Sequence, residues 1–183
     1  ANIGLENTDI TTNERGAIVV NDTCESSVPG VYAVGDVNGG PQFTYISLDD
    51  FRIVFDALTG NGQYTLKDRK NIPYTTFLTP PLARVGLTEQ EAINKGYTVK
   101  AKELLVATMP RAHVNDNLKG AFKIVVNTEN NLILGATLYS QSAEELINLI
   151  KMAMDNNIPY TYFKNQIFTH PTMAENLNDL CNF

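Results

Sequence analysis

The sequence lacks several features that would point to a metal cluster, a local redox centre or a nucleic-acid-binding surface. Its two cysteines, Cys24 and Cys181, lie far apart, so neither a Cys-x-x-Cys nor a Cys-x4-Cys pair occurs. We therefore expect no zinc cluster and no local redox pair, and we expect both thiols to be inert. The formal net charge of −6 argues against a nucleic-acid partner, which would usually need a basic surface.

Long apolar runs are also missing. No segment approaches the roughly 18 apolar residues that are needed to span a bilayer. The first residues show neither the basic region nor the apolar core of a secretory signal. We therefore expect no membrane association, and a cytoplasmic location is the default expectation. The chain opens in loop-like sequence without a methionine, which indicates a piece of a longer protein.

The first part of the sequence predicts a partial α/β unit. Two short apolar runs, residues 17–20 and 31–34, are typical of strands. Apolar residues recur at helical spacing over residues 45–58, and the pattern ends near Gly60, so we expect an amphipathic helix there. A polar and irregular stretch follows at residues 60–72, and we place a domain boundary within it.

The second part predicts an α+β domain with an antiparallel sheet flanked by helices, because strand patterns follow one another with helical patterns beside them. The expected strands are residues 74–77, 99–108, 121–126 and 132–138, the last two joined as a hairpin. The expected helices begin at the capping box of residues 88–91 (TEQE), at residue 143 and at residue 171.

One of these helices carries an apolar stripe made of Leu146, Ile147, Ile150 and Met154. Charged and polar side chains occupy the opposite face of the same helix. The stripe either packs on the chain's own sheet or forms part of an interface with a second chain. The spacing leaves both possibilities open.

A Gly-Asp pair ends the apolar run within residues 26–36 (SSVPGVYAVGD). Glycine allows the backbone to approach a ligand closely, and the following carboxylate can accept hydrogen bonds from ligand hydroxyls. Alone, the pair is typical of a strand that ends in a turn. The eleven residues together resemble the second FAD fingerprint of flavoproteins with two dinucleotide-binding domains. The resemblance implies that Asp36, with Gly35 beside it, binds the ribityl chain of FAD, although Ser26 replaces the usual threonine.

The residues that follow extend this resemblance. Gln42, Phe43 and Thr44 correspond to the family's loop that touches the flavin ring and opens a helix, whose N-terminal amides face the ring. Residues 45–54 (YISLDDFRIV) depart from the segment rich in alanine and glycine that is usual there. They resemble a bacterial branch that includes the reactive-chlorine-resistance flavoprotein and hypothiocyanous acid reductases.

A second motif lies in residues 168–175 (FTHPTMAE). Pro171 suits the first position of a helix, which would place His170 at the helix entrance and Glu175 just over one turn further. A carboxylate on one imidazole nitrogen fixes the tautomer, and histidine can exchange protons near neutral pH. The spacing by itself favours a plainer interpretation, in which His170 caps a helix and Glu175 is solvated.

His-Pro-Thr-x-x-Glu resembles the catalytic dyad of the FAD-dependent pyridine nucleotide–disulfide oxidoreductases. The resemblance implies that His170 of one subunit exchanges a proton with a redox thiol of the other, while Glu175 orients the ring. Shorter matches at residues 79–88, 117–123 and 143–148 occur in the family's order. The resemblance therefore covers nearly the whole chain.

This family membership would make the chain the C-terminal part of an enzyme, with a partial FAD-binding segment at residues 1–70 and a dimerisation domain at residues 71–183. Such an enzyme is a homodimer that passes electrons from NAD(P)H through FAD to a disulfide or a small oxidant. The resemblance to the bacterial branch implies that this oxidant is hypothiocyanous acid. The redox cysteines and the Gly-rich nucleotide motifs would lie outside this chain. We therefore expect the chain alone to be inactive and to bind no cofactor tightly.

Two alternatives stay open. The chain could be a non-catalytic homodimerisation module with no ligand of its own. It could also come from relatives of the NADH oxidase and peroxidase type, which use a single sulfenic cysteine, although the His-Pro-Thr-x-x-Glu motif favours a dithiol enzyme.

The remaining candidate residues have plainer interpretations. We expect His113 at the surface or at an interface. Asp49 and Asp50 lack a third ligand for a metal, so we interpret them as a first-turn pair that the helix dipole stabilises. Residues 67–70 (KDRK) are expected to form a solvated loop.

Overall fold

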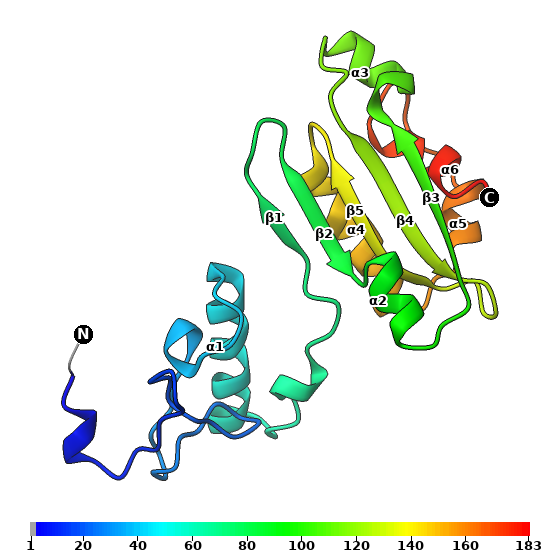
Figure 1. The fold of residues 1–183 in the computed structure, drawn as a ribbon. Helices are drawn as coiled ribbons and strands as arrows, with labels where there is room; N and C mark the ends of the chain where they lie inside the picture. Colours follow the sequence, from blue (N-terminus) through cyan, green and yellow to red (C-terminus); the bar gives the residue numbers. More distant parts are fainter. Residues whose placement is uncertain (1–2) are drawn as a thin grey trace. The chain divides into compact units, whose positions relative to one another are not determined.

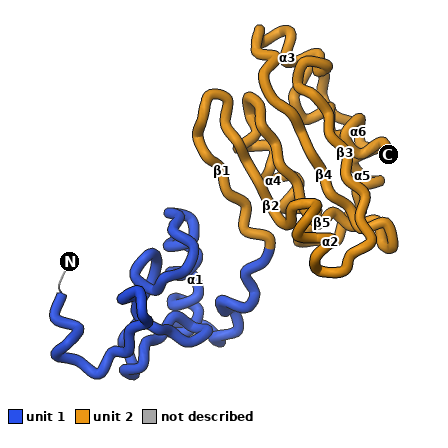
Figure 2. Tube along the Cα trace, viewed as in Figure 1, with its two compact units in different colours: residues 1–70 blue, residues 71–183 orange. Residues whose placement is uncertain are grey.

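The computed structural model describes residues 3–183, and the chain divides into two compact units, Ala1–Lys70 and Asn71–Phe183 (Figure 2). The division lies inside the polar stretch of residues 60–72. Among the described residues, no helix is both long and apolar enough to cross a membrane.

Unit 1 is organised around one long helix, α1 (Thr44–Thr59), which ends at Gly60 as the apolar spacing predicts (Figure 1). The inner face of α1 buries Ile46, Asp50 and Ile53. The other elements of the unit are the short 3-10 turns η1 (Leu5–Asn7), η2 (Gly35–Asn38) and η3 (Leu66–Asp68).

The two strands expected in unit 1 are not formed. Among the described residues, the runs at 17–20 and 31–34 each contribute one isolated bridge, Thr12↔Ile18 and Glu25↔Tyr32. A strand needs a hydrogen-bonding neighbour along its whole length, and neither run has more than a single pair. The two apolar runs are therefore present, but in the described residues they do not pair with a neighbouring strand over their length.

Unit 2 contains a five-stranded antiparallel sheet in the order β1-β2-β5-β4-β3, which is the α+β fold that the sequence predicts (Figure 1). The strands are β1 (Tyr74–Thr76), β2 (Leu82–Gly86), β3 (Val99–Leu105), β4 (Ala121–Asn127) and β5 (Ile133–Tyr139). The helices and 3-10 turns are α2 (Glu89–Asn94), η4 (Val106–Thr108), α3 (Pro110–Val114), α4 (Ala143–Asp155), α5 (Tyr160–Asn165), η5 (Ala174–Asn176) and α6 (Leu177–Leu180).

The core of unit 2 lies between the sheet and its helical layer. The register aligns Ala83 with Leu138, and Leu138 with Phe122, so these side chains share one face of the sheet. All three are fully buried. Helix α4 packs on β2 and β5, and α6 packs on β3 and β4, on the same face (Figure 1). The opposite face of the sheet is mixed: the paired positions Arg84, Lys123 and Glu103 carry charged side chains there, and Val125 on the same face is buried.

The apolar stripe of α4 belongs to this core. Leu146, Ile147 and Ile150 are 5%, 2% and 0% exposed, and they cluster with buried residues of β2, β4 and β5. Met154 is partly buried against the same cluster. Of the two possibilities that the spacing leaves open, the stripe therefore packs on the chain's own sheet.

Helix α2 covers one end of this opposite face. Its capping box is formed as predicted: the Thr88 hydroxyl accepts from Glu91 N (3.2 Å), and Glu91 Oε2 accepts from Thr88 N (2.7 Å). Lys123 Nζ on β4 contacts Glu89 Oε2 at 2.7 Å, which ties α2 to the sheet. The start of this helix follows directly from the sequence.

Strand β3 is shorter than the sequence predicts. It ends at Leu105, whereas residues 99–108 have strand character throughout. The chain turns instead through η4, and the Thr108 hydroxyl closes the turn by donating to Leu105 O (2.7 Å). A local side-chain hydrogen bond thus ends the strand.

Candidate functional site

The structure brings the predicted acid–base residues into direct contact. His170 Nδ1 lies 2.8 Å from Glu175 Oε2. The histidine side chain is 68% exposed, whereas that of Glu175 is only 19% exposed. Because a carboxylate accepts, the contact places the proton on Nδ1 and leaves Nε2 at the surface. No residue in the described part of the chain hydrogen bonds to Nε2, so this atom can exchange a proton with another molecule.

The second oxygen of Glu175 is bonded to the backbone, and this bond holds the carboxylate in place beside His170. Glu175 Oε1 accepts from Thr172 N (3.1 Å), and the Thr172 hydroxyl accepts in return from Glu175 N (3.2 Å). The same hydroxyl donates to Thr169 O (2.8 Å). This reciprocal arrangement is that of a capping box. Glu175 is thus held by the backbone on one side and holds the imidazole on the other.

The helix expected from Pro171 begins later than predicted. The His170–Pro171 peptide bond is cis, Pro171 precedes the helical turns, and regular structure starts only with η5 at Ala174. The reciprocal pair between Thr172 and Glu175 spans the start of these turns, after the proline. Pro171 is therefore not the first residue of the helix, and His170 lies in an exposed segment ahead of η5.

The predicted flavin turn forms η2 in unit 1. Gly35 has φ = +71°, and a Cβ atom at this position would lie 2.5 Å from Ser47 Oγ of α1. Only glycine fits such a position without straining the backbone and moving the Ser47 side chain. Asp36 follows directly and is exposed. The local fold thus buries the glycine against α1 and leaves the aspartate carboxylate open to a ligand.

The other predicted flavin contacts lie at the start of α1. Gln42 and Phe43 immediately precede the helix, and Thr44 is its first residue. Gln42 and Thr44 are exposed, and Phe43 is partly buried with its ring stacked on Tyr45 (5.1 Å between centroids). Since η2 packs against α1, both predicted flavin-binding segments are attached to one helix.

The interpretation of Asp49, Asp50 and Arg69 is wrong. The two aspartates lie in the second turn of α1, beyond the first turn where the helix dipole acts most strongly, and Arg69 is not solvated. Arg69 Nε contacts Asp49 Oδ2 (2.7 Å), and Arg69 Nη2 contacts Asp50 Oδ1. Asp50 Oδ2 in turn accepts from Gly35 N at 2.7 Å. A buried ion-pair network therefore reaches the flavin turn.

Comparison with known proteins identifies the family. Residues 72–181 match the profile of the pyridine nucleotide-disulphide oxidoreductase dimerisation domain, and residues 1–50 match that of the pyridine nucleotide-disulphide oxidoreductases. The chain belongs to the pyridine nucleotide–disulphide oxidoreductases. These are FAD-dependent enzymes with NAD(P)H as electron donor.

Three relatives show how far the similarity extends. The chain is 48% identical over 180 residues to the probable pyridine nucleotide-disulfide oxidoreductase RclA of Escherichia coli, covering 98% of this chain and 41% of RclA. It is 34% identical to mercuric reductase of Staphylococcus aureus, covering 96% and 32%. The solved structure of HOCl-induced flavoprotein disulfide reductase RclA from Escherichia coli superimposes with a TM-score of 0.96 at 48% identity, covering 99% and 42%. The chain thus spans about two fifths or less of these relatives.

The two cysteines of this family member have the properties of buried structural thiols. Cys24 and Cys181 are both free and fully buried. Burial, assisted by the nearby charge of Asp50, raises the pKa of Cys24 to about 11, and burial raises the pKa of Cys181 to about 12. Because the thiolate is the reactive form, neither side chain is suited to redox chemistry near neutral pH.

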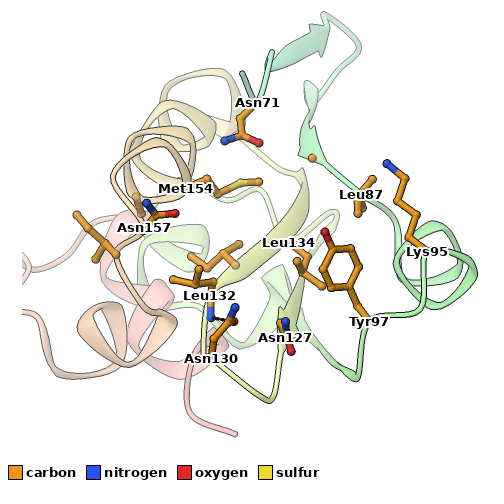
Figure 3. A pocket seen from close by; sticks show the side chains of 14 residues that line it. Asn71, Leu87, Lys95, Tyr97, Asn127, Asn130, Leu132, Leu134, Met154 and Asn157 are labelled. Carbon is orange, nitrogen blue, oxygen red and sulfur yellow. Dashed lines mark hydrogen bonds between the residues drawn. The ribbon is translucent and has the colours of Figure 1, made fainter. Parts of the chain in front are cut away.

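A separate cleft of about 370 Å³ lies in unit 2 (Figure 3). Figure 3 shows Leu87 and Tyr97 on one side of it, and Met154 and Asn157 on the other. None of its lining residues is a histidine, cysteine, aspartate or glutamate, and none is a predicted site residue. The cleft therefore offers binding surface without an acid–base pair.

The remaining polar candidates form no metal site. In residues 3–183, no group of three or more histidine, cysteine, aspartate or glutamate side chains is placed to hold a metal ion. His113 is exposed, as expected, and its Nε2 donates to Ala107 O (2.8 Å). The ring of His113 is therefore bonded to a backbone carbonyl, whereas the ring of His170 is bonded to a carboxylate.

Proposed function

We propose that this chain is the dimer-interface and flavin-turn part of an NAD(P)H-dependent flavoprotein that reduces a disulfide or a small oxidant through a redox dithiol. The observation that carries the proposal is the His170–Glu175 contact of 2.8 Å together with the exposed Nε2. An imidazole held in one tautomer by a carboxylate and open on its other nitrogen is the arrangement of a general acid–base group.

The role of His170 follows from the chemistry of disulfide reduction. Converting one disulfide into two thiols takes up two electrons and two protons. Reactive thiols work as thiolates, so a nearby base is needed to remove and return a proton. We assign this step to His170 Nε2, with Glu175 stabilising the protonated ring. The thiols themselves are not Cys24 or Cys181, which are buried, and they would come from another part of the protein.

The residues of unit 1 fit a flavin nucleotide. The Gly35 backbone lies in a conformation that a side chain would block, and the exposed Asp36 carboxylate can accept hydrogen bonds from the hydroxyls of a ribityl chain. When bound, FAD would carry electrons from NAD(P)H to the disulfide. Asp36 would bind and orient its sugar-like chain, and Gln42, Phe43 and Thr44 would contact its ring.

We infer that the working unit is a homodimer in which each chain supplies His170 to its partner's dithiol. Two observations support this. The dimerisation-domain profile covers residues 72–181, and the described part of the chain offers no redox thiol next to the exposed Nε2. Mixing subunits that carry complementary defects tests whether two chains build each site.

The purified 183-residue chain should be colourless and should not titrate FAD at micromolar concentrations. The reason is its coverage of about two fifths of its relatives, because most contacts to the adenine half of FAD would lie in the remainder. Flavin absorbance and fluorescence titration check this, with the full-length protein as a yellow, stoichiometrically loaded control. Tight FAD binding by the chain alone would contradict the expectation, and a full-length protein without FAD would overturn the proposed function.

The oxidant that we favour is hypothiocyanous acid or a related small electrophile. This choice rests on the 48% identity to RclA, whose solved form is described as HOCl-induced, compared with 34% identity to mercuric reductase. In an NAD(P)H-consumption assay, the full-length protein should turn over hypothiocyanous acid faster than Hg²⁺ or lipoamide. A preference for Hg²⁺ or lipoamide would refute this choice of substrate and keep the proposed reaction class.

A further inference from the structure

The flavin turn is attached to α1 through one buried carboxylate. Asp50 is 0% exposed, and its Oδ2 accepts two hydrogen bonds, from Gly35 N (2.7 Å) and from Asn38 Nδ2 (2.9 Å). These two donors stand at the first and last residues of η2. A single oxygen therefore holds both ends of the turn that presents Asp36.

The other oxygen of Asp50 is held from a distant part of the sequence. Arg69 Nη2 contacts Asp50 Oδ1, while Arg69 Nε contacts Asp49 Oδ2 at 2.7 Å. Tyr64 completes the network by donating its hydroxyl to Asp49 Oδ1 (2.8 Å). The guanidinium thus bridges two carboxylates on α1, a geometry that the planar fork of arginine allows and that lysine cannot reproduce.

The network is shielded from solvent, so its charges interact strongly. The side chains of Arg69, Asp49 and Asp50 are 11%, 15% and 1% exposed. Burial works against the charge on Arg69, but the hydrogen bonds to Asp50 and Asp49 outweigh it and raise the pKa of Arg69. A buried carboxylate without its partner would be costly, so the contact with Arg69 offsets the burial of the carboxylate that accepts from Gly35 N.

We propose that Asp50 and Arg69 are positioning residues for the flavin site: they fix the turn Gly35–Asn38 so that Asp36 faces the cofactor. The inference rests on the proposed role of Asp36 in binding FAD. It adds a function for two residues that do not touch the cofactor. The charge-assisted bonds to the turn define its shape, and the shape sets the direction of the Asp36 carboxylate.

The test compares two pairs of variants in the full-length protein. Asp50→Asn and Arg69→Gln remove one charge each from the buried network. Asp22→Asn and Lys67→Gln make the same charge changes in an ion pair of the same unit whose side chains are 49% and 78% exposed. We expect the first two to raise the dissociation constant of FAD by about tenfold or more, and the two controls by less than about twofold.

A purely structural role would give a different pattern. The dissociation constant and the visible spectrum of bound flavin are therefore measured at a temperature where circular dichroism shows every apoprotein variant folded. If Asp50 and Arg69 only stabilise the fold, the folded variants will bind FAD as wild type does, with an unchanged spectrum, and this result would overturn the inference. Arg69→Lys should recover only part of the affinity, because it reaches one carboxylate.

Two further outcomes separate this inference from the proposed function. If the wild-type protein binds FAD and Asp36→Ala weakens binding while Asp50→Asn and Arg69→Gln do not, only the positioning role fails. If wild type does not bind FAD, the proposed function fails and the inference fails with it. Should Asp50→Asn or Arg69→Gln not fold, Arg69→Lys carries the test, because it keeps a positive charge beside the two carboxylates but reaches only one of them.

Discussion

Replacing His170 with alanine in the full-length protein should slow dithiol turnover by about 10²–10⁴-fold, the usual contribution of a general acid–base group. The expectation follows from the geometry of the ring. Nδ1 is bound to Glu175 at 2.8 Å, and Nε2 is left at an exposed surface with nothing else in the described chain to use it. The measurement is the steady-state rate of NAD(P)H oxidation with the disulfide or oxidant substrate. Unchanged turnover would show that His170 is not the general acid–base group.

The chain supplies its own matched control for this experiment. His113 is its other histidine, is also exposed, and has its Nε2 bonded to Ala107 O (2.8 Å). His113→Ala removes the same ring and should leave turnover within about twofold of wild type, as surface substitutions generally do. Glu175→Gln should fall between wild type and His170→Ala, because it keeps the size of the side chain but weakens the hold on the imidazole.

Mixed dimers test whether the histidine works on the partner's thiols. Subunits with His170→Ala are combined with subunits that lack the redox cysteines, each inactive alone. Random pairing makes about half the dimers mixed, and each mixed dimer has one intact site, so about a quarter of wild-type activity should return. No recovery would show that His170 and the thiols act within one chain, or that the chains do not pair.

Replacing Ile150 with alanine should lower the free energy of unfolding of the chain by about 2–5 kcal/mol, the range for aliphatic side chains that leave a cavity in a core. Ile150 is 0% exposed and belongs to the cluster between α4 and the sheet. Urea unfolding followed by circular dichroism measures the change. Because the side chain is enclosed by its own unit, the loss should not depend on protein concentration.

The same helix offers the control for this core prediction. Met152 lies two residues further along α4 and is 62% exposed, so Met152→Ala should change the free energy of unfolding by less than about 1 kcal/mol. If Ile150→Ala left the unfolding curve unchanged but weakened dimer formation, the assignment of the stripe to the chain's own core would be incorrect.

Features encoded by neighbouring residues could be predicted from the sequence. The spacing at residues 45–58 gives α1 and its end at Gly60, and the pattern at residues 88–91 gives the start of α2. The contact between His170 and Glu175 spans only five positions, and it belongs to a motif specific enough to identify. For the two helices, the physical cause is a helical repeat or a local hydrogen bond, which leaves a short signature in the sequence. The His170–Glu175 contact was predicted from its resemblance to a family motif, because its spacing alone favours the plainer interpretation.

Features that depend on distant partners could not be predicted in this way. Arg69 lies 19 positions from Asp50, and nothing in residues 67–70 distinguishes a buried guanidinium from a solvated one. The runs at residues 17–20 and 31–34 have strand character, yet pairing partners decide whether a strand forms. The late start of the last helix could have been predicted. Thr172-x-x-Glu175 has the same capping pattern as residues 88–91, and it lies where the last helical turns begin.

The two oxygens of the Glu175 carboxylate have different partners, and this has a consequence for protein engineering. Its Oε1 shapes the backbone at Thr172, and its Oε2 orients the imidazole of His170, so backbone shape and ring direction change together. Transplanting only the histidine and the glutamate onto another scaffold would therefore not reproduce the pair. A functional graft would have to carry the contiguous hexapeptide, including the threonine that makes the return bond.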